Sequence, residues 1–198
     1  MQFADLDLQK VYSYADYFKW QFEERVELIK GKIFIMSPAP NPYHQELTGD
    51  IHALLHNFLR KKPCKVYTAP FDVRLPKTSK EDKQIFTVLQ PDICVICDLS
   101  KIDGRGCVGA PDIIVEILSP GNSEKELKEK KNVYEEAGVK EYWVVSPWYQ
   151  NFLVYTLEGD KFLPPFVKVP GDIITSTVLP EFSIDLTELF EDSEQENG

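Results

Sequence analysis

Two short and almost wholly apolar runs constrain the fold of this chain most strongly. Pro91–Cys97 reads PDICVIC and Pro111–Leu118 reads PDIIVEIL. Neither run alternates polar and apolar residues, as a strand with one solvent-facing side would. We therefore expect both runs to be strands of a sheet that helices cover on both faces.

Each run contains a carboxylate that a buried strand should not hold. Asp92 opens the first run, and Glu116 lies inside the second, with three apolar residues before it and two after it. Burying an isolated carboxylate is costly unless a cation compensates its charge. The sequence therefore predicts a partner for Glu116, either a hard cation such as Mg²⁺ or a buried Lys or Arg.

Asp112 competes with Asp92 as the companion of Glu116. On one strand, Asp112 and Glu116 would lie about 13 Å apart by the strand rise. Mg²⁺ binds its ligands at about 2.1 Å, so these two residues are too far apart to share an ion. Asp92 can lie roughly 5 Å away on the neighbouring strand. We therefore pair Asp92 with Glu116 and expect Asp112 to have a strand-start or turn role.

A charged helix is predicted over Ser123–Ala137, and Gly138 ends it. A lysine occupies the middle of its apolar face, because the apolar residues centre on the direction of Lys130. Such a lysine either extends to solvent or meets buried carboxylates. One interpretation of Lys130 is a structural ion pair with Glu116. The apolar residues of this face are Leu127, Val133, Tyr134 and Ala137.

All three histidines lie on a second amphipathic helix, predicted over Tyr43–Arg60. His44 begins this helix near its apolar edge, so we expect it to face a cleft. His52 and His56 have the spacing of a zinc pair, but they lie on the polar side without a third ligand. We interpret them as surface residues. Glu27, between two apolar residues of a strand-like run, is a weaker candidate for a buried carboxylate.

The cysteines give little support to a metal site. Cys94 and Cys97 have the two-residue gap of a zinc knuckle, but residues three apart on a strand point to opposite faces. We expect Cys64, Cys94, Cys97 and Cys107 to be small buried core residues, which fits a reducing compartment.

The net charge of -10 does not exclude nucleic acid as a partner. Residues 181–198 hold seven of these charges and no Lys or Arg, which leaves -3 for residues 1–180. We expect a single domain over 1–184 and an acidic tail over 185–198. Binding to DNA would then depend on a local basic patch, with the candidates Arg60, Lys61, Lys62, Lys125 and Lys128.

Membrane insertion and export are not expected. No apolar run approaches the roughly 20 residues of a membrane-spanning helix. The first nine residues are acidic and lack the basic and then apolar pattern of an export signal. We expect a cytoplasmic protein.

An Asp on one strand, a Glu on its neighbour and a nearby Lys resemble the site of the PD-(D/E)xK nuclease superfamily. The chain is more closely similar to the Uma2 family of restriction-endonuclease-like proteins. The residues that carry the likeness are Glu27–Gly31, Met36–Pro38 with His44, Pro91–Asp92, Ile114–Pro120, Lys130–Tyr134, Ala137–Val139 and Glu141–Trp143. One departure is that the usual lysine position, two residues after the Glu, is Leu118 here, and Lys130 takes its place.

The resemblance implies an α/β fold: a restriction-endonuclease-like mixed β-sheet flanked by helices. Its αβββαβ core would carry an N-terminal helix and hairpin and a C-terminal β extension. The implied activity is that of a Mg²⁺-dependent endonuclease on DNA, with Mn²⁺ as an alternative ion, acting as a homodimer. Exposed aromatic residues at Trp148 and Tyr149 are candidates for the dimer contact.

The resemblance also implies a role for each site residue. Asp92 and Glu116 would bind the metal ion together with the backbone carbonyl of Ile117, and Lys130 would stabilise the attacking water. His44 and Glu27 would lie near the scissile phosphate or the metal. Two alternatives stay open: a catalytically inactive binding or regulatory module with this fold, and a purely structural ion network of Asp92, Glu116 and Lys130.

Overall fold

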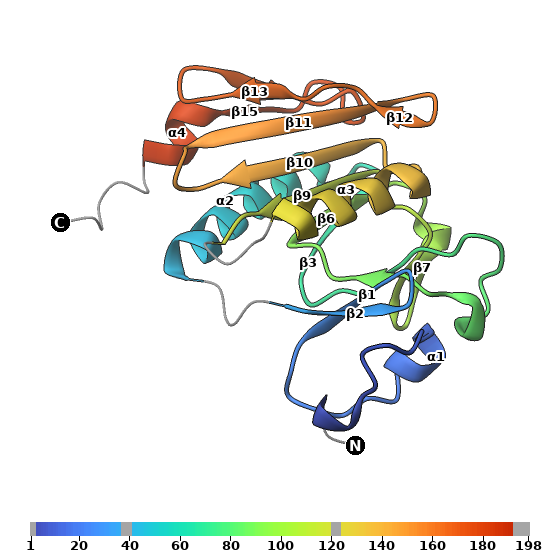
Figure 1. Ribbon diagram of the computed structural model, residues 1–198. Coiled ribbons are helices and arrows are strands. Elements are labelled where there is room, and N and C mark those ends of the chain that lie inside the picture. Colours follow the sequence, from blue (N-terminus) through green and yellow to red (C-terminus); the bar gives the residue numbers. More distant parts are fainter. Residues whose placement is uncertain (1–2, 37–40, 120–123, 192–198) are drawn as a thin grey trace.

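The computed structural model describes residues 3–36, 41–119 and 124–191, with side chains from residue 126 onward in the last range. Its centre is a mixed sheet with the strand order β12-β11-β10-β9-β6-β3 (Figure 1). Strands β9 and β10 are parallel, and the other neighbours in this order are antiparallel. The strands are β3 Lys65–Thr68, β6 Ile93–Ile96, β9 Ile113–Ile117, β10 Glu141–Ser146, β11 Asn151–Glu158 and β12 Lys161–Phe162, with β13 Phe166–Lys168 beside β11.

Helices cover both faces of this sheet, as the two apolar runs predict. Helix α2 (Pro42–Leu59) and the short α4 (Leu186–Glu191) pack on one face with Ile113, Val115 and Ile117. Helix α3 (Glu124–Ala137) packs on the other face with Ile114. Glu116 has the same parity as Ile114, so its side chain points toward α3.

A second sheet lies against the α3 face and has the order β2-β1-β5-β4-β8-β7. Its strands are β1 Val26–Ile29, β2 Lys32–Ile35, β4 Val73–Arg74, β5 Val88–Leu89, β7 Ile102–Asp103 and β8 Gly106–Val108. Strands β7 and β8 were not predicted, nor was the pair β14 (Ile173–Thr175) and β15 (Ser183–Asp185). Each of these strands has only two or three residues, too few to show a period.

The predicted hairpin of β1 and β2 closes through a two-residue turn at Lys30 and Gly31. Both residues have positive φ, 52° and 79°, as tight hairpin turns require. A Cβ atom on Gly31 would also clash with the side chain of Val11. Glycine therefore fits this turn best, and the turn fixes the register that buries Glu27 on β1.

Helix termini follow the capping residues of the sequence. Ser13 and Asp16 form a capping box on α1 (Tyr14–Tyr17). At the start of α2, the Asn41 side chain accepts a hydrogen bond of 2.8 Å from the backbone N–H of His44. This cap places His44 in the first turn of α2. The remaining short helices are 3₁₀ turns at Phe3–Asp5, Asp82–Gln84 and Leu99–Lys101.

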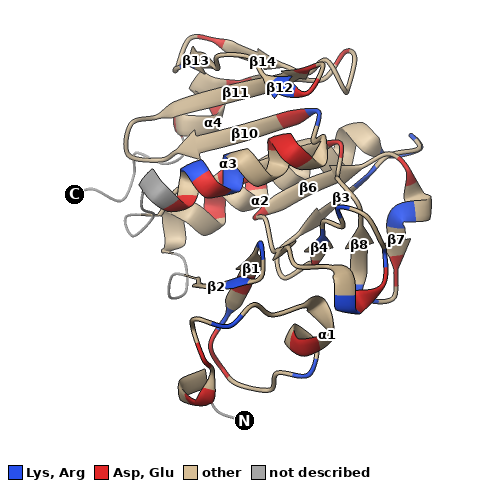
Figure 2. Ribbon diagram, turned by 45° about the vertical axis from the view of Figure 1, so that its right-hand side comes forward, with Lys and Arg blue, Asp and Glu red and all other residues tan. Residues whose placement is uncertain are grey.

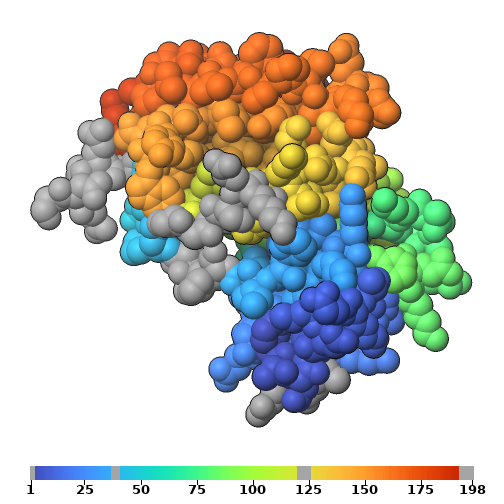
Figure 3. Space-filling model, viewed as in Figure 1, coloured from blue at the N-terminus to red at the C-terminus, as the bar shows by residue number. Residues whose placement is uncertain are grey.

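The N-terminal and C-terminal parts of the chain form opposite ends of the molecule (Figure 3). The N-terminal residues and the hairpin make one end, and strands β11 to β13 make the other (Figure 1). Among the described residues, no helix has the length and apolar character needed to cross a membrane.

Two expectations from the sequence are wrong in part. The acidic tail cannot begin at residue 185, because Leu186, Leu189 and Phe190 of α4 are buried in the core. Residues 192–198 lie outside the described part. Cys64 and Cys97 are not separate core thiols but form a disulfide bond.

The reason for the disulfide is the register of the sheet. Strand β3 pairs antiparallel with β6, with Lys65 opposite Ile96, so Cys64 and Cys97 are the next facing pair. Disulfides persist mainly in oxidising compartments. The cysteines therefore no longer support a reducing compartment. Cys94 and Cys107 are free and buried, as expected.

Candidate functional site

Asp92 and Glu116 face one another on neighbouring strands. The last paired residues of β6 and β9 at this end are Ile93 and Val115, and Asp92 and Glu116 follow one step outward. The backbone N–H of Ile117 donates a hydrogen bond of 2.8 Å to Asp92 Oδ2. The register of the sheet thus brings the two predicted carboxylates together.

Lys130 reaches this pair from helix α3. Its Nζ lies 3.2 Å from Glu116 Oε1 and 3.0 Å from Glu27 Oε2. The residue is buried, with 5% of its surface exposed. The helical periodicity correctly placed Lys130 on the inward face, and its ammonium group contacts the predicted carboxylate.

Glu27 enters the same cluster from the second sheet. It is 2% exposed, and its Oε1 accepts a hydrogen bond of 2.8 Å from the backbone N–H of Gln90. Strand β1, which holds Glu27, pairs with β5, where Leu28 lies opposite Val88. The two sheets therefore meet at Lys130, which bridges Glu27 and Glu116.

Tyr134 belongs to the cluster, although the sequence pattern indicated only a residue of the apolar helix face. Its hydroxyl donates a hydrogen bond of 2.7 Å to Glu116 Oε1. The signal in the sequence was its spacing, because residues four apart on a helix lie on one face and Tyr134 follows Lys130 by four positions. A buried tyrosine also needs a partner for its hydroxyl.

His44 contacts the exposed side of the carboxylate pair. Its Nε2 lies 3.3 Å from Asp92 Oδ2, and its ring also hydrogen-bonds the backbone carbonyl of Ile117. Burial lowers the pKa of His44, but the hydrogen bond and the charge of Asp92 outweigh burial and raise that pKa above its usual value. An imidazolium here would occupy the space between Asp92 and Ile117.

The pKa values of the cluster reflect burial and the charges of its neighbouring groups. Desolvation raises the pKa of Glu116 to about 7, against the opposing effects of Lys130 and the Tyr134 hydroxyl. Burial alone would lower the pKa of Lys130, but the charges of Glu116 and Glu27 outweigh it and raise that pKa. These shifts keep Lys130 protonated and make Glu116 easier to protonate than an exposed glutamate.

A cleft of about 320 Å³ opens onto Asp92 and His44. Residues of α2, including Thr48, line one side, and Thr68 at the end of β3 and the following Ala69 line another. Arg25 adds a cation to its wall. Asp92 has 20% of its side chain exposed, compared with 10% for Glu116. Solvent thus reaches the cluster from the side of Asp92.

The other candidates lie outside the cluster. Asp112 is buried at the opposite end of β9, where it accepts a hydrogen bond from the backbone of Cys97 and pairs with Lys140. This agrees with the strand-start role expected for it. His56 is exposed on α2, and His52 is partly exposed at the edge of the cleft.

The expected basic patch is dispersed. Arg60, Lys61 and Lys62 are exposed at the far end of α2, about 24 Å from His44 by the helical rise. Lys128 is exposed on α3, where basic and acidic residues alternate along the ribbon (Figure 2). The side chain of Lys125 lies outside the described residues.

The donor set suits a hard divalent ion. Two carboxylates, Asp92 and Glu116, and the carbonyl of Ile117 lie together at one end of β9, and oxygen ligands of this kind are those that Mg²⁺ prefers. Among the described residues, no three His, Cys, Asp or Glu side chains form a metal-binding group by themselves. An ion here would rely on the carbonyl and on water beside two carboxylates.

Comparisons with known proteins identify the family and the fold of this chain. The family with the description "Uma2: Putative restriction endonuclease" matches residues 14–187. A crystal structure of a "putative nuclease belonging to DUF820" from Anabaena variabilis superposes with a TM-score of 0.73 at 18% identity, and covers 91% of this chain and 98% of that chain. No curated protein matches the chain. The structural likeness confirms the predicted α/β fold.

Proposed function

The chain belongs to the Uma2 family of restriction-endonuclease-like proteins, and from this premise we propose that it hydrolyses DNA phosphodiester bonds with a divalent metal ion, Mg²⁺ or Mn²⁺. Asp92 and Glu116 would hold the ion together with the carbonyl of Ile117. A bound ion would supply Lewis-acid activation of water and would neutralise negative charge at the phosphate.

One observation carries this proposal: the carboxylates of the cluster outnumber its lysine. Glu27 and Glu116 share the single ammonium of Lys130, and Asp92, whose charge helps to raise the pKa of Glu116, contacts His44 instead. Burial of an uncompensated carboxylate is unfavourable, and the raised pKa of Glu116 expresses that cost. A divalent ion would provide the missing positive charge.

The other side chains of the cluster would have separate roles in the reaction. Lys130 stays protonated because of its raised pKa, so it would act electrostatically and stabilise the attacking water or hydroxide rather than remove its proton. Glu27 and Tyr134 hold Lys130 and Glu116 in position. His44, which lines the cleft, would donate a hydrogen bond to a phosphate oxygen.

The test is cleavage of supercoiled plasmid DNA with Mg²⁺, Mn²⁺ or EDTA. The wild-type protein should nick or linearise the plasmid only with a divalent ion, and Asp92→Asn and Lys130→Ala should each abolish this activity. Asp160→Asn, at an exposed turn between β11 and β12, is the matched control and should cut normally. Cleavage that survives both site substitutions would remove this cluster from the mechanism.

A binding or regulatory module without turnover is the second candidate, and the closed ion network favours it. Both carboxylates that contact Lys130 already pair with it at 3.0 and 3.2 Å. If the protein is such a module, it should neither cleave DNA nor bind a divalent ion specifically. Calorimetric titration with Mn²⁺ separates the two, because the nuclease proposal requires heat of binding that Asp92→Asn removes.

The proposal extends to a homodimer and to a cytoplasmic location, where DNA is available, although the disulfide of Cys64 and Cys97 is more typical of an oxidising compartment. Cutting both strands of a duplex calls for two sites, and Trp148 and Tyr149 offer exposed aromatic surface, at 48% and 80%. Light scattering after gel filtration would measure the mass. A monomeric wild-type protein under the conditions of cleavage would contradict the dimer.

A further inference from the structure

A second cavity of about 450 Å³ lies beside the cleft. The two spaces share Arg25, and the chain passes from the wall of one to the other through the neighbouring residues Ala69 and Pro70. Gln90, on the floor of the second cavity, precedes Asp92 by two residues. The cavity volume lies within the usual range for a small-ligand site.

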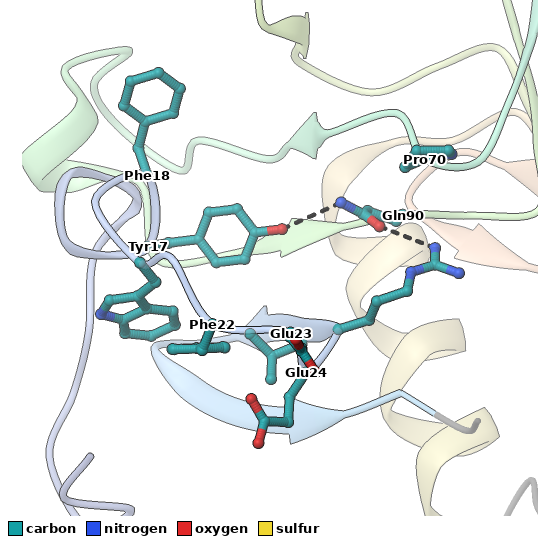
Figure 4. A pocket seen from close by; sticks show the side chains of 10 residues that line it. Tyr17, Phe18, Phe22, Glu23, Glu24, Pro70 and Gln90 are labelled. Atoms are coloured by element: carbon teal, nitrogen blue, oxygen red, sulfur yellow. Dashed lines mark hydrogen bonds between the residues drawn. The ribbon is translucent and has the colours of Figure 1, made fainter. Parts of the chain in front are cut away.

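Aromatic rings form one wall of this cavity (Figure 4). Trp20 and Phe22 are nearly parallel, with ring centroids 5.6 Å apart and an interplanar angle of 29°. Tyr17 lies against Trp20 at 5.7 Å. Trp20 and Phe22 are each only partly buried. This wall offers aromatic faces to a flat ligand.

The floor of the cavity is polar and fixed in place. Nε2 of Gln90 donates to the Tyr17 hydroxyl at 3.2 Å and to Asp72 at 2.9 Å. Arg25 donates to Oε1 of Gln90 at 3.1 Å (Figure 4). An amide oxygen accepts two hydrogen bonds, so Gln90 can also accept one from a ligand N–H. The amide is thus oriented before any ligand arrives.

Charge at the cavity argues against a phosphate as its occupant. Glu23 and Glu24 line it and are exposed, so they would repel an anion while accepting hydrogen bonds from amino groups. Arg25 is the basic residue of its lining, and it stands at the boundary with the cleft. A phosphate therefore suits the boundary, and a neutral ring with N–H groups suits the cavity.

We infer that this cavity receives one unpaired nucleobase of the DNA, the base next to the phosphate that lies in the cleft. The inference rests on the proposed nuclease function and specifies its substrate class as DNA with a single-stranded or extrahelical nucleotide. Base stacking on Trp20 and Phe22 would hold the ring, Gln90 and Glu24 would contact its edge, and Arg25 would hold the adjoining phosphate.

The same residues connect the cavity to the catalytic cluster. The backbone N–H of Gln90 donates to Glu27, which pairs with Lys130. A base that contacts the Gln90 side chain would thus contact the same residue whose backbone N–H holds Glu27 in position. One short segment, Gln90–Asp92, would therefore both contact the base and hold residues of the catalytic cluster in position.

The experiment compares two labelled DNAs of one sequence, a fully paired duplex and the same duplex with one extra unpaired nucleotide. Affinity is measured by fluorescence anisotropy in EDTA, where no cleavage occurs, and kcat/KM is measured with Mg²⁺. The wild-type protein should prefer the unpaired nucleotide by at least 5-fold in both assays. Phe22→Leu should lower affinity for that DNA by about 5- to 100-fold and leave the paired duplex unaffected.

Three further variants test whether the preference depends on the aromatic rings of the cavity. Phe22→Tyr keeps the ring and should keep the preference. Phe18→Leu removes a second lining ring that is 57% exposed, so the fold should tolerate it, and it should reduce the preference. Phe166→Leu, on β13 and 66% exposed, is the matched control outside the cavity.

The two assays separate failure of this inference from failure of the nuclease proposal. Equal affinity of the wild-type protein for both DNAs, or an undiminished preference in Phe22→Leu and Phe18→Leu, overturns the base site whether or not the DNA is cut. A preference that these variants abolish in EDTA, without cleavage of either DNA in Mg²⁺, upholds the base site and overturns the nuclease activity.

Discussion

The ammonium group of Lys130 lies 3.2 Å from the carboxylate of Glu116, although Lys130 is on helix α3 and Glu116 is on strand β9. In the motif that the chain resembles, the lysine follows the glutamate on one strand. Here α3 crosses the sheet and delivers the cation from outside it. The position of the charge is thus set by packing between a helix and a sheet.

Removal of Lys130 should destabilise the metal-free protein strongly. Lys130→Met leaves Glu27 and Glu116 buried without their cation, at a cost of about 3–5 kcal/mol. Urea denaturation in EDTA measures this loss. Lys161→Met is the control, because Lys161 pairs with Glu135 on the surface and exposed pairs contribute about 1 kcal/mol or less. Equal losses in the two variants would mean that Lys130 does not compensate a buried charge.

The Tyr134 hydroxyl should stabilise ionised Glu116. Tyr134→Phe removes a hydrogen bond to a buried charged acceptor, which should cost about 1.5–3 kcal/mol at pH 8. The neighbouring Tyr142 provides a matched control, because its buried hydroxyl has no hydrogen-bond partner among the described residues. Tyr142→Phe should be neutral or slightly stabilising. If both variants lose the same stability, the bond to Glu116 contributes nothing specific.

Affinity for divalent ions should rise with pH. Desolvation raises the pKa of Glu116 from 4.5 to about 7. The stability that protonated Glu116 contributes is therefore complete below pH 4.5, its pKa in the unfolded chain, and is lost as the pH rises through about 7. An ion must displace this proton, and Mn²⁺ affinity should therefore increase by up to about 10-fold per pH unit until pH 7 and then level off.

Calorimetry from pH 5.5 to 8.5 measures this dependence. Glu116→Gln cannot bind the proton. The increase of Mn²⁺ affinity with pH that Glu116 causes should therefore vanish in that variant, even if weak binding remains. A wild-type affinity that is constant over this range would show that Glu116 is not a ligand.

The disulfide of Cys64 and Cys97 should be measurable in thiol number and in stability. The unfolded, unreduced protein should show two free thiols, from Cys94 and Cys107. Reduction should cost about 2–4 kcal/mol, because the bond closes a long loop. A count of four thiols without reductant would contradict the bond.

Much of the cluster could be predicted from the sequence, because its members break strong patterns. A glutamate inside an apolar strand and a lysine inside an apolar helix face are both conspicuous, and the packing of α3 on β9 brings them together. The pairing of Asp92 with Glu116 could be predicted because the two residues can face each other on neighbouring strands. Glu27 gave only a weak signal, since it depends on how the second sheet docks.

Features that depend on register between distant segments could not be predicted. Cys64 and Cys97 are 33 residues apart, and nothing local fixes β3 against β6 so that they face each other. The aromatic cavity likewise forms where Trp20 and Phe22 meet Gln90 of a distant segment. Short strands such as β7 and β8 are held by neighbouring strands rather than by their own pattern.

The most direct test of the central claim is the anomalous diffraction of a crystal soaked in Mn²⁺. The proposed metal site predicts a single strong peak about 2.1 Å from carboxylate oxygens of Asp92 and Glu116 and from the carbonyl of Ile117, with the ring of His44 moved away from Asp92. A crystal with no peak at this position, in which His44 and Lys130 keep their contacts to Asp92 and Glu116, would contradict it.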